Sequence, residues 1–513
     1  MAPLQVPACF SQLPALPYLP LVLICGSVTP IKPTITSRKE HSISRKWISP
    51  NAVRVLYKLK EHGYYAYLVG GGVRDLLLGR EPKDFDIATD ATPNEVKKVF
   101  RNCRLIGRRF RLAHIHFHDD IVEVATFRSM MSDEPEIIEA VPVVAAAMDY
   151  AVPELPVQEE AIPPVAETTS AAPVAKPRPP RMLKTDDGMI LRDNVFGTPE
   201  EDALRRDFTV NALFYNIADY SVIDYVGGME DLRRGRIRII GDPMVRFTED
   251  PVRMVRAVRF TALLGFDIEA ETYRAMLELK DKVALASPSR MYEEVLKLFL
   301  LGEGEKTYQL LRKTGLFGVI FPQLNTWVDT ESDGFPHTWI GKALEWVDAC
   351  VQSGRQVPPL ILFSLLFGQY IEEKAAALRV AGIPPVDALN SAVTGIMVEQ
   401  AVRVQIPKKI SLAMRDIYWS QQRFEKREGK YPRYFMRRPG FVDAFEYLRF
   451  TSEATGEKKD IRAWWKEFIK RNPLAPGEEK EIQKLVEKKA QPKRRRRRGG
   501  KGRHEGQTPK PKL

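Results

Sequence analysis

Two aspartates separated by one residue, Asp84 and Asp86, are the part of this sequence best suited to chemistry. In an extended strand the side chains alternate between faces, so these two carboxylates would point the same way, about 7 Å apart along the backbone. Carboxylate oxygens are the ligands that hard cations such as Mg²⁺ and Mn²⁺ prefer. We therefore predict Asp84 and Asp86 as the metal ligands and catalytic carboxylates of an active site.

A glycine-rich segment precedes this pair. Gly70, Gly71 and Gly72 are followed by Arg74 and Asp75. Glycines let a backbone approach a phosphate chain closely, and a neighbouring arginine adds a positive charge. An Asp-X-Asp pattern alone is weak evidence because turns often contain it. After this glycine segment, it indicates metal-dependent transfer of a nucleotidyl group from a bound triphosphate.

Other polar residues could complete the site. Glu123 lies in an alternating strand pattern and could supply a third carboxylate, or it could form a structural ion pair. Asp207 lies between Arg206 and Asn211. Arg206 could pair with phosphate, and Asp207 and Asn211 could bond to ribose hydroxyls. An ion pair on a helix surface would give the same pattern for Asp207, but its neighbours favour a functional role.

A basic helix pattern follows further along the chain. Asp250 and Arg253 are three residues apart, so one helical turn could present both to a base edge. A capped helix start with an ion pair would also explain them. Arg253, Arg256 and Arg259 recur every three residues and predict a basic ridge along one side of the helix.

Three histidines, His114, His116 and His118, alternate in a strand pattern, so they would share a face. That spacing can bind a metal. The segment just before them is basic, however, which disfavours a cation and favours a strand edge facing phosphate or RNA. The basic residues are Arg108, Arg109 and Arg111.

Short α and β elements are predicted to position these residues. Helices are expected at residues 50–62, 73–78 and 93–100, and strands at 66–69, 85–88, 114–117 and 121–126. Ser49 is the expected N-cap of the first helix. A helix is expected over 198–215, then a hairpin of 221–225 with 237–240, and helices from 250 almost to 489. This pattern predicts an α+β fold, with a small mixed sheet followed by helices.

The domain prediction follows composition along the 513 residues. We expect a poorly ordered leader (1–40), a head (41–240), a helical neck (241–300), a helical body (301–487) and a basic tail (488–513). Within the head, residues 131–180 read as an acidic Pro/Ala-rich insertion, with nine acids and no Lys or Arg between 131 and 175. It could be a neutral surface loop or a segment that competes with RNA for the tail.

The net charge of +12 lies almost entirely in the tail. Residues 488–513 contain twelve Lys or Arg and one Glu, so they carry +11. Such a run, with Arg494, Arg495 and Arg496 at its centre, would neutralise RNA phosphates with low sequence specificity. A solvated tail without a dedicated partner would look the same.

Aromatic and basic residues also alternate in the helical region. Trp419 and its neighbours suit stacking on single-stranded RNA, although core aromatics would give the same pattern. The set is Tyr418, Trp419, Arg423, Arg433, Arg437 and Arg438.

The cysteines and the apolar segments indicate in which cellular compartment the protein is expected. Cys9, Cys25, Cys103 and Cys350 are scattered, with neither a disulfide framework nor zinc spacing, so a reducing, cytoplasmic environment is expected. The apolar segment 16–26 is short and interrupted by prolines, and no run reaches the roughly 20 residues that span a bilayer. No stable membrane insertion is therefore expected.

Taken together, these motifs resemble the class II tRNA nucleotidyltransferase/poly(A) polymerase family. The matching segments are 68–75, 84–86, 205–212, 249–253 and 256–259. The resemblance covers roughly residues 41–130 and 185–480. Segment 105–117 and the Arg-rich extension are similar to the bacterial poly(A) polymerases of this family rather than to its CCA-adding members. The insertion departs from the family pattern between the Glu123 strand and Asp207.

The resemblance implies roles for individual residues. Asp84 and Asp86 match the metal-binding carboxylates, Asp207 the third active-site acid, and Glu123 lies in the corresponding strand. Asp250 and Arg253 match the nucleotide-recognition motif of CCA-adding relatives. The full set expected to bind nucleotide is Gly71, Gly72, Arg74, Arg206, Asn211, Asp250, Arg253 and Arg256.

The implied reaction adds AMP from ATP to single-stranded RNA 3′ ends without a template. In a two-metal mechanism, one ion activates the attacking hydroxyl and the other steadies the leaving pyrophosphate. The expected enzyme is a monomer that polyadenylates transcripts in the cytoplasm and contacts RNA-decay proteins. A CCA-adding enzyme that uses CTP and ATP on tRNA is the alternative. A catalytically idle RNA-binding protein is a second alternative, which intact Asp84, Asp86, Arg74 and Asp207 disfavour.

Overall fold

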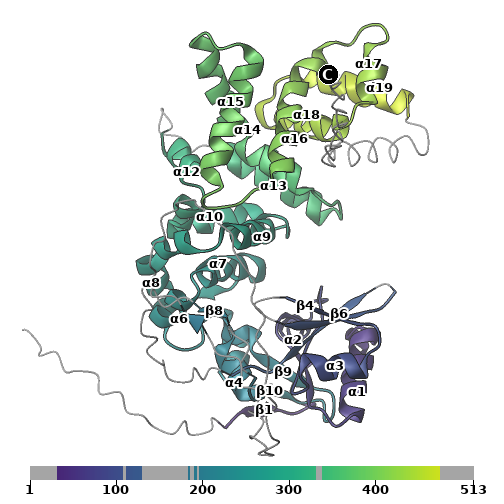
Figure 1. The fold of residues 1–513 in the computed structure, drawn as a ribbon, viewed down its shortest axis with the longest axis vertical. Coiled ribbons are helices and arrows are strands. Elements are labelled where there is room, and N and C mark those ends of the chain that lie inside the picture. The colour runs from purple at the N-terminus through teal and green to yellow at the C-terminus, as the bar shows by residue number, and fades with distance from the viewer. Residues whose placement is uncertain are drawn as a thin grey trace, which may run out of the picture.

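A head that contains a sheet lies at one end of the molecule, and helices extend from it to the other end (Figure 1). The computed structural model describes residues 32–107, 111–118, 120–129, 183–184, 190–192, 196–330 and 338–473. The predicted order, a mixed-sheet head followed by helices, is confirmed. Among the described residues, no helix combines the length and apolar character needed to cross a bilayer.

Eight strands form the main sheet, in the order β1-β10-β9-β2-β3-β6-β5-β4. β3 and β6 pair in parallel, and every other neighbouring pair is antiparallel. The strands are β1 (Thr34–Thr36), β2 (Ala66–Val69), β3 (Asp86–Thr89), β4 (Cys103–Ile106), β5 (Leu112–His116), β6 (Ile121–Thr126), β9 (Leu213–Asn216) and β10 (Val222–Asp224). The sheet is mixed, as predicted, but larger, because β1, β9 and β10 come from segments far from the central strands.

Helices cover this sheet where the apolar spacing predicts them. α1 (Pro50–Glu61) and α3 (Pro93–Val99) contact strands of the sheet, and Leu56, Leu59 and Leu68 are buried in one core. A capping box of Thr92 and Glu95 begins α3. Ser49 makes no side-chain cap for α1, and its Oγ instead donates to Asp120 Oδ2 at 3.2 Å. Ser49 thus occupies the predicted N-cap position of α1, where its carbonyl accepts the Val53 N–H at 3.0 Å, but its side chain makes no capping bond.

Two predictions for the second half of the head are wrong. The helix expected over 198–215 ends early: α4 (Pro199–Arg205) is followed by a 3₁₀ turn, η2 (Thr209–Asn211), and then by β9. The residues of β9 become a strand because they pair with both β2 and β10. Such long-range pairing overrides a local helical pattern.

The expected hairpin of 221–225 with 237–240 does not form either. β10 pairs with β9 and β1, and α5 (Gly228–Arg234) follows it. The Asp224 carboxylate starts this turn by accepting the backbone N–H groups of residues 226 to 229. Arg236–Ile237 (β11) instead pairs in parallel with Asp267–Ile268 (β12). A separate pair consists of β7 (Leu183–Lys184) and β8 (Ile190–Arg192).

The described residues between 241 and 473 are mainly helical, as predicted, with β12 as a short strand among them. The helices next to the head are α6 (Pro243–Glu249), α7 (Val252–Leu264), α8 (Ala270–Leu279), η3 (Lys280–Leu285), α9 (Pro288–Phe299), α10 (Gly304–Thr314), α11 (Leu316–Ile320) and α12 (Pro322–Asp329). The far end contains α13 (Trp339–Gln352), α14 (Pro359–Val380), α15 (Pro385–Gln400), α16 (Lys408–Gln421), η4 (Gln422–Glu425), α17 (Tyr431–Met436), α18 (Phe441–Thr455) and α19 (Lys459–Arg471).

The boundaries of the expected leader, insertion and tail are only partly visible. Thr34–Thr36 pairs with β10, so the head starts before residue 41 and the leader prediction is wrong there. A short 3₁₀ turn, η1 (Arg45–Trp47), connects this strand to α1. The insertion of 131–180, the earlier leader residues and the tail of 488–513 lie outside the described residues.

Candidate active site

Asp84 and Asp86 lie where β3 begins. Asp86 is the first residue of β3 and pairs with Val69, the last residue of β2. Asp84 lies two residues earlier, in the loop before β3. The strand was expected to start at residue 85, one residue before its observed start at Asp86. Both side chains are exposed. The loop runs close to α2 (Gly71–Leu77), since a Cβ on Gly72 would lie 3.3 Å from the Asp84 carbonyl oxygen.

The Asp86 carboxylate is in an electrostatically unfavourable position. Desolvation by the surrounding protein raises its pKa to about 6, and the charges of Glu123 and Asp84 add to the rise, while Arg206 opposes it. The side chain is still exposed to solvent, although the charges of Glu123 and Asp84 act on it. Because unlike charges favour the ionised form, a bound cation would relieve this strain.

Glu123 lies beside Asp86 on the neighbouring strand. Each comes one residue before the paired Ile87 and Val124 of the parallel strands β3 and β6. Its Oε2 lies 3.2 Å from Nε2 of His114, which is opposite it on β5. The sheet register therefore brings the predicted third-carboxylate candidate to the edge that carries Asp86.

The glycine segment forms the turn from β2 into α2. Gly70 has φ +72°, a conformation that glycine adopts without strain, and α2 begins at Gly71 rather than at the expected residue 73. Arg74 is buried and its guanidinium is occupied: Nη1 donates to Asn211 Oδ1 at 2.6 Å and Nε to Asp75 Oδ1 at 2.9 Å. In this structure Arg74 thus joins α2 to the η2 segment.

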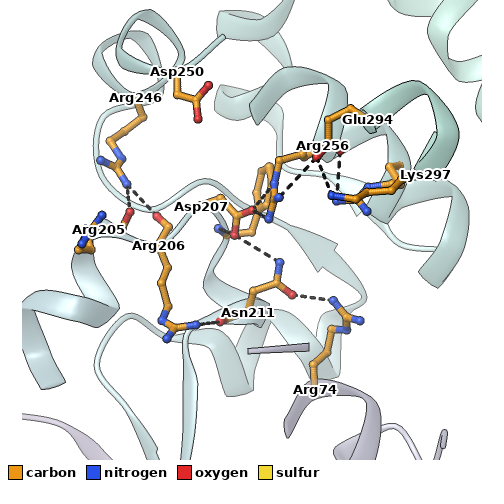
Figure 2. A network of polar contacts seen from close by, with 12 residues as sticks. Arg74, Arg205, Arg206, Asp207, Asn211, Arg246, Asp250, Arg256, Glu294 and Lys297 are labelled. Carbon is orange, nitrogen blue, oxygen red and sulfur yellow. Dashed lines mark hydrogen bonds and ion pairs between the residues drawn. The ribbon is translucent and has the colours of Figure 1, made fainter. Parts of the chain in front are cut away.

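Asp207 lies at the centre of a polar network between the head and α7 (Figure 2). Its Oδ1 accepts the Phe208 backbone N–H at 2.8 Å and Asn211 Nδ2 at 3.3 Å. Its Oδ2 accepts Nε of Arg256 at 2.7 Å. Burial alone would raise the pKa of Asp207, but Arg256 and these hydrogen bonds lower it to about 2. Asp207 is therefore ionised throughout the neutral range.

The Arg206 side chain is held by residues of α4 and β9. Its Nη2 pairs with Asp202 Oδ2 at 2.9 Å, and its guanidinium lies over the Phe214 ring. The backbone around it is fixed by Arg246, whose Nη2 donates to the carbonyls of Arg205 and Arg206 at 2.6 and 2.8 Å. Arg206 lowers the pKa of Asp86, so its positive charge is felt at the carboxylate cluster.

The three arginines of α7 do not form a free basic ridge. Arg253 donates to the Arg246 carbonyl at 2.8 Å and lies 3.6 Å from Glu249. Arg256 approaches Glu294 of α9 at 3.9 Å (Figure 2). Arg259 approaches the same carboxylate at 3.5 Å. Neutralisation of this row by acids from α6 and α9 corrects the predicted ridge.

Asp250 and Arg253 are not paired with each other. Asp250 caps the end of α6, before α7 begins, and accepts both Nη1 and Nη2 of Arg290, at 2.8 and 2.7 Å. Although the two side chains have different partners, the Arg253 backbone N–H donates to the Asp250 carbonyl at 3.1 Å, so the residues lie one turn apart, as their spacing predicts. A helix break at Asp250–Pro251 lies within this turn.

Sequence reasoning missed Arg246, Arg290 and Glu294, which hold the predicted residues in place. Arg246 is buried within α6, and Glu294 is buried within α9. A charged residue on an apolar helix face is a signal for such a role, but the partner becomes visible only when helices distant in sequence pack together.

The expected RNA-binding residues are mostly not covered. Arg108, Arg109 and the tail arginines Arg494, Arg495 and Arg496 lie outside the described residues. Arg111 is exposed just before β5. His114 and His116 lie on β5, whereas His118 lies beyond its end, so the three do not share one strand face.

The carboxylates at and just before the start of β3 suit a hard divalent cation. Mg²⁺ is typically held by one or two carboxylates together with substrate phosphates and water. Asp84 and Asp86 provide two accessible carboxylates of this kind. Within the described ranges, no three or more His, Cys, Asp or Glu side chains are arranged as a metal-binding group. The phosphates of a bound nucleotide would have to supply the remaining oxygen ligands.

Comparison with known proteins covers nearly the whole chain. A family model described as "Poly A polymerase head domain" matches residues 66–238. Models described as "Probable RNA and SrmB- binding site of polymerase A" and "Polymerase A arginine-rich C-terminus" match residues 265–328 and 381–501.

Similar proteins agree with these matches. Poly(A) polymerase I of Salmonella typhimurium is 40% identical, over 90% of this chain and 91% of its own length. The CCA-adding enzyme of Bacillus pumilus is 37% identical, but over only 52% of this chain and 54% of its own. The structure of the Bacillus stearothermophilus CCA-adding enzyme in complex with CTP shares the fold, with a TM-score of 0.50 and 23% identity over 85% of this chain and 91% of that one. The chain belongs to the poly(A) polymerase family.

Proposed function

We propose that this protein is a template-independent polymerase that adds AMP from ATP to RNA 3′ ends and releases pyrophosphate. The observation that carries the proposal is the 40% identity to a poly(A) polymerase I across nine-tenths of both chains. The sequence likeness to the CCA-adding enzyme of Bacillus pumilus extends over only 52% of the chain. The proposed enzyme is a polynucleotide adenylyltransferase active in RNA processing and decay.

Asp84 and Asp86 are the proposed metal-binding carboxylates, with Glu123 beside them. When bound, divalent ions supply positive charge for the attacking hydroxyl and the leaving pyrophosphate. Mg²⁺ is the proposed ion, with Mn²⁺ as a substitute. The raised pKa of Asp86 supports this assignment, because the cluster has an excess of negative charge that a cation would balance.

The remaining residues are proposed to position the substrates. The glycine turn at Gly71 and Gly72 lies beside Asp84 and is proposed to hold the triphosphate of ATP. Arg206, close enough to act on the Asp86 carboxylate, is proposed to stabilise negative charge on the transferred phosphate. The RNA 3′-hydroxyl attacks the α-phosphorus in line, and catalysis comes mainly from positioning and charge stabilisation.

Asp207 acts in this proposal through the network around it. It holds Asn211 and Arg256 in fixed positions, and Asn211 in turn holds Arg74. Arg74 is therefore proposed to support the triphosphate turn through α2. Asp250, Arg253 and Arg256 form the part of the α6–α7 junction proposed to face the base of the incoming nucleotide.

The partners and compartment follow from the same proposal. Single-stranded RNA 3′ ends and ATP are the proposed substrates, with RNA-decay proteins as contacts. Cys103 and Cys350, the two described cysteines, are free and buried, which is compatible with the proposed reducing cytoplasm. A monomeric enzyme with a head, a helical neck, a helical body and a basic RNA-binding tail is proposed.

The test uses full-length protein with Mg²⁺ and two acceptors, a plain single-stranded RNA and a tRNA that lacks CCA. Each is incubated with ATP alone, CTP alone or both, and the products are resolved on a sequencing gel. A long ladder from ATP alone on plain RNA is expected. Addition that requires CTP and stops after completing CCA on the tRNA would identify a CCA-adding enzyme and overturn the proposal.

A further inference from the structure

A hollow in the helical body, distant from the head, has features of a ligand site. It has a volume of about 210 Å³ and lies among α14, α15, α16 and the residue that caps α19. In Figure 1 these helices stand at the end of the molecule opposite the sheet. The side chains that matter around it are Glu372, Arg379, Trp419, Gln422 and Lys458.

Trp419 is one of the aromatic residues that line this hollow. It is half-buried, while its neighbours Tyr418 and Ser420 are buried. Tyr418 is fully engaged, because its hydroxyl donates to the Ser364 carbonyl at 3.0 Å and its ring meets Tyr447. Within the part of the chain that the structure describes, the Trp419 ring has neither a ring contact nor a hydrogen bond. A large indole left beside a hollow is available for stacking.

Glu372 supplies a fixed acceptor at the same place. The buried Tyr447 hydroxyl lies 3.0 Å from its Oε1, which fixes the carboxylate. Desolvation raises the pKa of Glu372, whereas Tyr447, Lys458 and Arg379 act to lower it. Glu372 itself is exposed, and its Oε2 has no hydrogen bond to the described residues.

Arg379 and Lys458 add positive charge at the rim. Arg379 is exposed and makes no side-chain ion pair among the described residues. Lys458 lies 3.7 Å from Glu425 and has φ +50°, in the left-handed region that residues other than glycine rarely adopt. Strained conformations of this kind concentrate at ligand sites.

We propose that this hollow binds one nucleotide of single-stranded RNA upstream of the 3′ end. The base stacks on Trp419 and donates an N–H to Glu372, and its phosphate lies against Arg379 and Lys458. An aromatic face beside cations is the arrangement by which proteins hold single-stranded RNA. The volume is below the roughly 300–1,000 Å³ of sites for whole small ligands, so it suits one unit of a polymer.

This inference depends on the proposed function only in assuming that the protein binds RNA. The RNA would run from its 3′ end in the head, along the neck, to the body. Contacts this far apart make affinity depend on RNA length, since a short RNA held by the head cannot also reach the body.

The test measures dissociation constants for labelled single-stranded oligoadenylates of increasing length, without ATP, on the full-length protein. Trp419→Ala is expected to weaken binding of the longer RNAs by roughly 5- to 150-fold, the effect of losing one stacked base. Trp419→Phe, which keeps an aromatic face, should recover most of it. Trp47→Ala removes an exposed tryptophan of the head and should leave every constant unchanged.

A second variant does not depend on the tryptophan. Lys458→Asn removes one charge but keeps a residue that tolerates positive φ. The slope of log affinity against log salt concentration should therefore fall by about the amount that one phosphate contact contributes. Circular dichroism confirms that each variant is folded. Wild-type constants for both Trp419→Ala and Lys458→Asn at all lengths would overturn the proposal, even if the protein polymerises AMP. Weaker RNA binding in a protein that adds no AMP would support this site and reject the proposed function.

Discussion

Arg256 of α7 donates its Nε–H to Oδ2 of Asp207 at 2.7 Å and so joins the first neck helices to the sheet-bearing head. Arg256 also approaches Glu294 of α9, at 3.9 Å. One arginine therefore connects the predicted third active-site acid to two helices. Any shift of α7 relative to the head would move Asp207 and, through Asn211, the buried Arg74.

Asp207→Asn is expected to lower the free energy of unfolding by about 2 kcal/mol at pH 7. The pKa of Asp207 is lowered in the folded state, so the ionised carboxylate stabilises the fold above the unfolded pKa. That contribution is lost as the pH falls from about 4 toward 2. Urea unfolding of the wild type and the variant should converge over this range. Asp460→Asn, which breaks an exposed pair with Arg427, serves as the control and should cost less than about 1 kcal/mol.

Asp84→Ala should abolish AMP incorporation and leave RNA affinity close to that of the wild type. The reason is that the carboxylate is proposed to hold a catalytic cation, while the proposed RNA contacts lie in the helices and the tail. Primer extension and RNA binding are measured on the same preparation. Retained incorporation would reject Asp84 as a metal ligand.

Asp86→Asn is expected to stabilise the free protein while it removes activity. The folded-state pKa of Asp86 is raised to about 6, so the ionised carboxylate destabilises the fold increasingly as the pH rises from about 4 to 6. The gain at pH 7 should be roughly 1 kcal/mol, less than the full shift because the side chain reaches solvent.

Thermal unfolding with and without Mg²⁺ tests the same residue in a second way. The ion should raise the melting temperature of the wild type, because it binds only the folded site, and should have less effect on Asp86→Asn. A variant that is less stable than the wild type at pH 7 without metal would contradict the electrostatic argument.

Gly72→Ala should reduce incorporation without unfolding the protein. Its Cβ would lie 3.3 Å from the Asp84 carbonyl oxygen, so the loop that carries Asp84 must shift. The shift needed is a few tenths of an ångström. Because a displacement of about 1 Å at a catalytic group costs on the order of 10²-fold in rate, the expected loss is smaller than that. Single-turnover incorporation is the measurement. Gly341→Ala, in α13 with no atom within 4 Å of the new Cβ, is the matched control and should keep full activity.

Removal of residues 488–513 should weaken RNA binding and flatten its dependence on salt. This segment carries a net charge of +11, so it contributes mainly through counterion release. The dissociation constant is measured for one RNA across a salt series, with and without the segment. Equal slopes for the two proteins would exclude the tail as an RNA contact.

The sequence alone was sufficient to predict candidate site residues and the general order of the fold. Asp84, Asp86 and the glycine turn are close together in the chain, so local geometry links them without knowledge of the fold. The segments 50–62 and 93–100 were correctly predicted as helices, because helix signals act within one or two turns.

Only the tertiary structure decided the long-range relationships. β9 is a strand because β2 and β10 flank it, and the Arg256 row faces acids of α6 and α9 because those helices pack there. Arg74 was predicted to face phosphate, yet it holds Asn211, 137 residues away in the sequence. Burial and packing across the whole chain determine such partners. The neighbouring residues in the sequence therefore do not reveal them.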